Sequence, residues 1–189
     1  FNPDDLPQLN VSEEDYRILR SGGVSDQMAS FLSSECKSWD IIRSVEIGCA
    51  AGYGSLTILR SGSPEHYGLD ISKQFYRDKR FRTGELALDS PNYKLLIGLP
   101  GDIVPPLPKF NLVYIDADHR HPAPTIDLWN LVVTEKIIYP FKLLLDDTYF
   151  AIRTRKSGFK SRGALVLMHA LESQFDSYYS PPMNQAGIN

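Results

Sequence analysis

Five short stretches of the chain are dominated by apolar residues, and each ends at a glycine, a serine or an aspartate. Near-continuous apolar runs of this length are typical of parallel strands that are buried on both faces. The pattern predicts strands over residues 44–48, 66–72, 93–98, 111–118 and 141–147.

Between the strands, apolar residues recur at helical spacing. One predicted helix, 26–36, places Met28, Phe31 and Leu32 on one face. Another, 162–175, carries a core stripe of Leu165, Met168, Leu171 and Phe175. Further helices are expected from Ser12 to about residue 20, from 55 to 60, within the charged stretch 72–90, and over 123–133.

Alternating strands and helices predict an α/β fold, with a Rossmann-like, mostly parallel sheet and helices on both faces. A chain of 189 residues suits a single domain, 1–189, in which residues 1–40 form an N-terminal helical segment leading into the sheet.

Composition narrows the class of protein. With 42% hydrophobic and 23% charged residues the chain has the composition of a soluble globular protein. A formal net charge of −3 gives no electrostatic case for nucleic acid. No apolar run approaches the roughly 20 residues that span a membrane, and the first ten residues are unlike a signal peptide. Two cysteines without metal-type spacing favour a reducing cytoplasm. The sequence leaves open whether the protein forms a homo-oligomer.

A glycine-rich turn follows the first predicted strand, in the sequence VEIGCAAGYGS of residues 45–55. Glycines let backbone N–H groups approach a ligand closely, so strand, turn and helix together indicate a nucleotide site. The glycine spacing fits the dinucleotide fingerprint poorly, because Ala50 stands where its second glycine would fall. Asp70 follows Gly48 by 22 residues, close to the interval at which an acidic residue reaches ribose hydroxyls. The alternative is that Asp70 caps the next helix.

With acidic Glu46 two residues before Gly48, the turn resembles motif I of class I S-adenosylmethionine (SAM)-dependent methyltransferases. Ala50 departs from the commonest form of that motif. A generic strand-turn-helix corner is the alternative interpretation. The resemblance implies a methyltransferase fold and a set of residues around the cofactor: Glu46, Gly48, Ala50, Gly52, Tyr53, Asp70, Asp102 and Asp116.

Acidic residues also follow the fourth and fifth predicted strands. Asp116, Asp118, His119 and His121 come after one, and 146–147 after the other. Ligands of open α/β sheets bind beyond the carboxyl ends of the strands. Carboxylates from two strand ends could hold a hard cation such as Mg²⁺, and a coordinated hydroxyl becomes a better nucleophile. Paired aspartates can equally cap a helix or bind water.

The segments IDADHRHPAPTIDLW and LLLDDTY resemble metal-dependent small-molecule O-methyltransferases, most closely those that methylate sugar hydroxyls of natural products. The resemblance implies Mg²⁺ or a similar cation on Asp116, Asp146 and Asp147, with Asp118 or His119 as the base and a hydroxylated small molecule as acceptor. Asp127 is interpreted as structural.

Two departures from that family are visible. Residues 138–141 replace its usual turn before the fifth strand, and the C-terminal hairpin that closes the family's sheet is expected to be incomplete here. Two alternatives stay open: a metal-independent methyltransferase acting on another substrate class, and a non-catalytic cofactor-binding homologue. The basic stretch 153–162 is expected to be a solvated loop, or less simply a lid for an anionic group.

Overall fold

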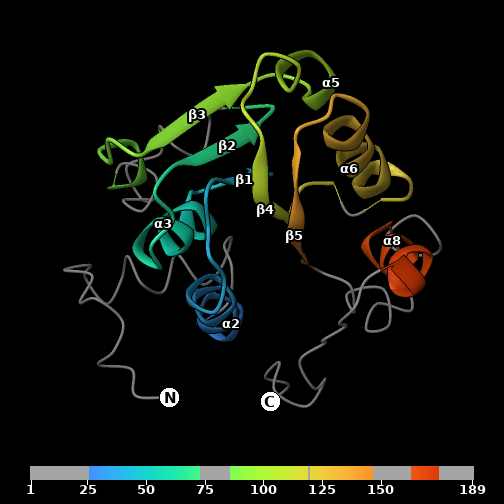
Figure 1. Cartoon of the computed structure of the whole chain (residues 1–189). Helices are drawn as coiled ribbons and strands as arrows, with labels where there is room; N and C mark the ends of the chain where they lie inside the picture. Colours follow the sequence, from blue (N-terminus) through green and yellow to red (C-terminus); the bar gives the residue numbers. More distant parts are fainter. Residues whose placement is uncertain (1–25, 73–85, 119, 147–162, 175–189) are drawn as a thin grey trace, which may run out of the picture.

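Parallel strands form the centre of the molecule. The computed structural model describes residues 26–72, 86–118, 120–146 and 163–174. Within these residues the sheet has five strands in the order β3-β2-β1-β4-β5, and every pairing is parallel (Figure 1). The strands are β1 Ser44–Ile47, β2 His66–Asp70, β3 Tyr93–Ile97, β4 Phe110–Ile115 and β5 Ile137–Leu145. The predicted α/β parallel sheet is confirmed.

The strand order reverses between β1 and β4. The chain builds outward from β1 to β3 and then returns to the other side of β1. Ile47 at the end of β1 is in register with Leu69 of β2 and Ile115 of β4, and Ile115 is in register with Leu145. The strand ends are therefore level, and the crevice at the reversal is the expected ligand site of such a sheet.

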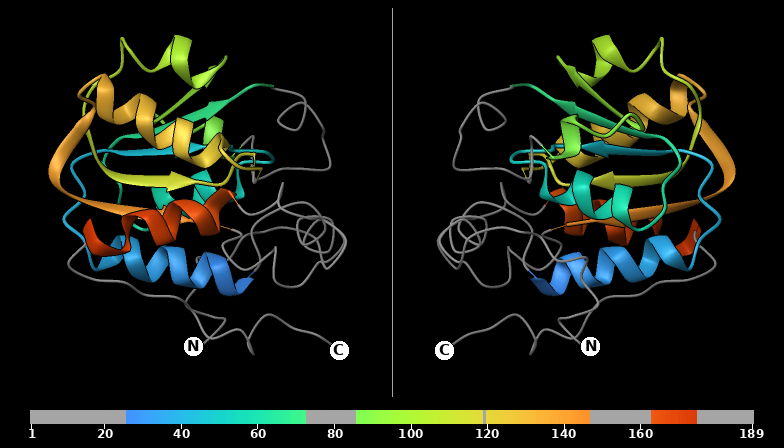
Figure 2. Two further views of the ribbon diagram at one scale, coloured as in Figure 1. Left: turned by 90° about the vertical axis from the view of Figure 1, so that its right-hand side faces the viewer. Right: turned by 90° about the vertical axis from the view of Figure 1, so that its left-hand side faces the viewer.

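Helices cover both faces of the sheet. They are α2 Asp26–Lys37, α3 Tyr53–Arg60, α5 Pro100–Ile103, α6 Ala123–Val133 and α8 Gly163–Leu171, followed by the 3₁₀ turn η4 Glu172–Gln174. Helices α2 and α3 pack together on one side, and α6 with α8 lies on the other (Figure 1). Figure 2 gives two side views, in which the strands run across the picture with α6 drawn above β4 and α2 below it.

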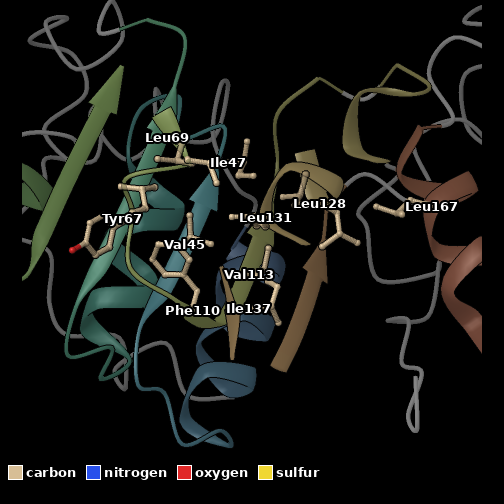
Figure 3. Close-up of a cluster of buried hydrophobic side chains, with 13 residues drawn as sticks. Val45, Ile47, Tyr67, Leu69, Phe110, Val113, Leu128, Leu131, Ile137 and Leu167 are labelled. Atoms are coloured by element: carbon tan, nitrogen blue, oxygen red, sulfur yellow. The ribbon is translucent and has the colours of Figure 1, made fainter. Parts of the chain in front are cut away.

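The alternation of side chains along the central strands supplies two cores. Val45, Ile47 and Val113 face α6, where they meet Leu128 and Leu131 (Figure 3). The intervening residues of β4 face α2 and α3 and pack with Leu32, Cys36 and Ile58 in a second cluster.

Strand β5 begins earlier than the sequence predicts. Residues 138–141, expected to form the turn before it, lie inside the strand. The register against β4 shifts between Phe110 and Leu112. Because proline has no N–H to donate, Pro140 is tolerated at such an irregularity on an edge strand.

Helix α8 confirms a predicted helix but buries a different face. Ala164 and Leu167 are the buried apolar residues, and Leu171 packs against the core beside them. Leu165 and Met168 of the predicted stripe are only half-buried. Phe175 lies outside the described residues, as do the helix predicted from Ser12, most of 72–90 and the C-terminal hairpin.

No helix in the described ranges is both long and apolar enough to cross a membrane.

Candidate cofactor and metal site

The glycine-rich turn leaves β1 and passes across the end of β4. Gly48 has φ 88° and Gly52, at the N-cap of α3, has φ 78°, both in the left-handed region that favours glycine. A Cβ atom on Gly48 would lie 2.6 Å from the amide nitrogen of Ala117, closer than any real contact. A side chain at residue 48 is therefore excluded both by backbone conformation and by space.

Ala50 is the non-glycine residue of this turn with a positive φ, 40°. Such a conformation costs an L-residue with a Cβ atom about 1–2 kcal/mol. The residue that departs from the commonest motif is therefore the one that carries backbone strain.

Asp70 holds the turn from the end of β2. Its Oδ2 accepts hydrogen bonds from the backbone amides of Cys49 and Ala50 at 2.9 and 3.0 Å, and its Oδ1 accepts one from Ser72 at 3.0 Å. A carboxylate offers about four lone-pair positions, so the same group can brace the turn and still accept a ligand hydroxyl.

Cys49, inside the turn, is a packing residue. Its thiol is buried and free of any disulfide. Burial raises the pKa of this thiol well above its usual range, and the charges of Glu46 and Asp70 raise it further. A thiol that stays protonated is not a nucleophile.

Glu46 lies beneath the turn, fully buried. Its Oε2 accepts a hydrogen bond from the Ser55 hydroxyl of α3 and lies 3.4 Å from Nε2 of His66. The Ser55 hydroxyl is also 3.0 Å from that of Tyr93. The carboxylate thus ties α3 to β1 and β2, and the predicted contact of Glu46 with a cofactor stays a prediction.

The two acidic strand ends meet beside the turn. The amide of Asp116 donates to the carbonyl of Ile47 at 2.9 Å, and the amide of Asp146 donates to that of Ile115 at 3.1 Å. These bonds continue the ladder and place both aspartates at the same level. Between them lies the hydroxyl of Tyr114, 3.3 Å from Oδ2 of Asp116 and 3.2 Å from Oδ2 of Asp146. Burial, with the charges of Asp146 and Asp116, raises the pKa of Tyr114 well above its usual range.

Solved structures of O-methyltransferases share this fold. One is the O-methyltransferase TomG from Streptomyces achromogenes, involved in tomaymycin synthesis, in complex with SAM; the TM-score is 0.66 and the identity 16%, over 92% of this chain and 83% of that chain. Another is the O-methyltransferase from Bacillus cereus in complex with S-adenosylhomocysteine (SAH), with TM-score 0.67 and 18% identity over 89% of this chain and 81% of that one. The chain has the methyltransferase fold.

At these identities the likeness concerns the fold alone. The sequence matches no protein-family model and no curated protein sequence.

Within this methyltransferase fold, Asp116 and Asp146 fit a hard cation by the chemistry of their donors. Carboxylate oxygens are the ligands that Mg²⁺ prefers, and the two carboxylates lie close enough to share one hydroxyl. The third predicted ligand, Asp147, lies outside the described residues. Among the residues that are described, no group of three or more His, Cys, Asp or Glu side chains could hold a metal ion.

The candidate bases follow β4. Asp118 accepts hydrogen bonds from the backbone amide of Arg120 at 3.0 Å and from its guanidinium Nε at 2.8 Å, so its carboxylate is engaged in an ion pair. His119 lies outside the described residues, and His121 is exposed. The structure therefore assigns Asp118 a partner but does not test either base.

Asp127 lies on α6 and is buried, and its interpretation as a structural residue stays a prediction. Burial and, to a smaller extent, the nearby charge of Asp118 together raise its pKa to about 6.

The remaining predicted cofactor residues are also placed. Tyr53 is buried as the first residue of α3, and Asp102 is exposed in α5. Two apolar residues that sequence reasoning missed are exposed at the same end of the sheet: Ile71, 72% exposed after Asp70, and Leu99, 63% exposed after β3. For Ile71 the available signal was its place directly after the strand-end residue Asp70.

Proposed function

We propose that this protein transfers a methyl group from SAM to a hydroxyl of a small molecule, assisted by a divalent cation. The observation that carries the proposal is the carboxylate of Asp70 bound to the amides of Cys49 and Ala50. It fixes a glycine-rich turn at the point where strand order reverses, in a fold shared with SAM- and SAH-bound O-methyltransferases.

The cofactor would lie across the turn. Asp70 has acceptor capacity left for ribose hydroxyls, and the exposed side chains of Ile71 and Leu99 offer apolar surface to an adenine ring. Gly48 and Gly52 allow close approach of the backbone to the rest of the cofactor, beside Tyr53. Asp102 would contact the cofactor from α5.

SAM would supply an electrophilic methyl group, and its transfer would break the bond to sulfur, form a bond to the acceptor oxygen, and release SAH and a proton. A divalent cation would lower the pKa of the acceptor hydroxyl that it coordinates. Asp116, Asp146 and Asp147 would hold the cation. Asp118 or His119 would take the proton, and for Asp118 this requires the acceptor to displace Arg120 from one carboxylate oxygen.

A small-molecule acceptor is supported by TomG, which is involved in tomaymycin synthesis. The fit of two carboxylates to a hard cation supports metal assistance.

The experiment is methyl transfer from isotope-labelled SAM into a panel of hydroxylated metabolites, with and without EDTA. We expect transfer that EDTA abolishes, that added Mg²⁺ or Mn²⁺ restores, and that Asp146→Ala lacks. Transfer unaffected by EDTA and by Asp146→Ala would contradict the role of the cation and favour the metal-independent alternative. Cofactor binding without transfer to any acceptor would favour the non-catalytic alternative.

A further inference from the structure

Tyr114 is a buried polar residue in the otherwise apolar run of β4. Its ring is 0% exposed and packs with Leu32, Cys36 and Ile58 of the helices on that face. A Cβ atom on Gly54 would lie 3.1 Å from Cε1 of the ring. Glycine at residue 54 thus leaves room for this ring at the start of α3, and packing on these sides fixes where the hydroxyl lies.

The hydroxyl lies between two carboxylates that come from different strands. It is within hydrogen-bonding distance of Oδ2 of Asp116, at 3.3 Å, and of Oδ2 of Asp146, at 3.2 Å. The hydroxyl has one proton, which it donates to one carboxylate at a time or shares between the two, so it couples the two side chains. A carboxylate oxygen that accepts this proton limits rotation about its Cβ–Cγ bond and so restricts the direction of the second oxygen.

We propose that Tyr114 is a positioning residue for the cation site: its hydroxyl orients Asp116 and Asp146 together, so that the oxygen donors of β4 and β5 are pre-arranged for a divalent cation. This inference rests on the proposed function, since it presupposes a cation on these aspartates. Metal ligands held by such hydrogen bonds typically lose 10–100-fold in metal affinity when the supporting group is removed.

The test is Tyr114→Phe, which keeps the packed ring and removes only the hydroxyl. The matched control is Tyr67→Phe. Tyr67 is also buried and donates its hydroxyl to a carboxylate, that of Glu65 at 2.7 Å, but Glu65 precedes β2 and so lies at the other end of the sheet. Binding of Mn²⁺ is followed by electron paramagnetic resonance, which reports both affinity and coordination of the bound ion, and binding of SAH is measured calorimetrically on the same proteins.

We expect Tyr114→Phe to bind Mn²⁺ about 10–100-fold more weakly, with an altered spectrum of the bound ion, while its SAH affinity stays within about twofold of wild type. Tyr67→Phe should match wild type in both. A loss of Mn²⁺ affinity below about threefold in Tyr114→Phe would overturn the inference. So would a parallel loss of SAH affinity, because Tyr114 would then act through packing against the turn. If wild type itself binds no Mn²⁺, the cation site of the proposed function fails first and this inference fails with it.

Discussion

Residue by residue, the glycine-rich turn combines two glycines in left-handed conformations with one alanine that adopts the same region. Ala50→Gly should therefore stabilise the protein by about 1 kcal/mol. The free-energy cost of a left-handed conformation for a residue with a Cβ atom exceeds the entropic cost of ordering a glycine on folding. Urea denaturation measures the change.

The neighbouring alanine provides the control for this prediction. Ala51 is buried and is not among the described residues with positive φ. Ala51→Gly should be destabilising by about 1 kcal/mol, since it adds chain entropy and removes a buried methyl group. Equal losses from both substitutions would contradict the strained conformation of Ala50.

The raised pKa of Asp127 makes a prediction about pH. Its pKa is about 6 in the folded state, against 3.8 for an unperturbed aspartate, so this carboxyl ionises at lower pH in the unfolded chain. Below about pH 4 the carboxyl is protonated in both states and costs nothing. Between about pH 4 and 6 the folded state loses stability, by about 2–3 kcal/mol in total, and the loss then levels off.

Asp127→Asn should remove this pH-dependent loss of folding stability. The difference in unfolding free energy between variant and wild type should grow in favour of the variant from pH 4 to 7, as measured by urea denaturation across that range. Parallel pH profiles for the two proteins would show that burial does not perturb this carboxyl.

Between elements, the decisive contact joins the end of β2 to the turn that follows β1. Asp70→Asn removes the charge that accepts from Cys49 and Ala50 and leaves a single carbonyl acceptor. Hydrogen bonds to charged groups contribute about 1.5–3 kcal/mol each. We expect SAH affinity to fall by about 10–100-fold in a calorimetric titration, since both the turn and the ribose contact are weakened.

Glu65→Gln is the matched control for Asp70→Asn. It makes the same change of charge just before β2 begins, where Glu65 is paired with Arg43 and Lys94. Its SAH affinity should equal that of wild type. An Asp70→Asn protein that also binds SAH like wild type would contradict the role assigned to Asp70.

For the whole molecule, the sequence predicted the sheet well because buried parallel strands carry apolar runs that end in polar residues. The predictions were wrong where local sequence preference and tertiary packing favour different structures. Tyr139 and Pro140 indicate a turn, but they lie inside β5 because Ile137 and Lys142 on either side of them pair with β4. In α8, GALVLMHAL is apolar on nearly every side, so periodicity could not select the buried face. Packing selects it: a Cβ atom on Gly163 would lie 2.7 Å from Cδ of Pro124.

The candidate site was predicted in part for a related reason. Strand-end aspartates are visible in a sequence, and the structure brings Asp116 and Asp146 together as expected. The hydroxyl between them was not predicted, because Tyr114 in an apolar run looks like any core aromatic residue. The binding of the turn by Asp70 likewise depends on backbone amides, which a sequence does not display. Asp147 and His119 lie outside the described residues, and their roles stay predictions.

The central claim is that the turn between β1 and α3 binds SAM, and calorimetric titration of the wild-type protein with SAH tests it most directly. SAH binds in the same place as SAM but needs neither an acceptor nor a cation, so the result does not depend on the unidentified substrate. We predict saturable binding of one SAH per chain, accompanied by an increase in Tm. The absence of both binding heat and thermal shift would contradict the account.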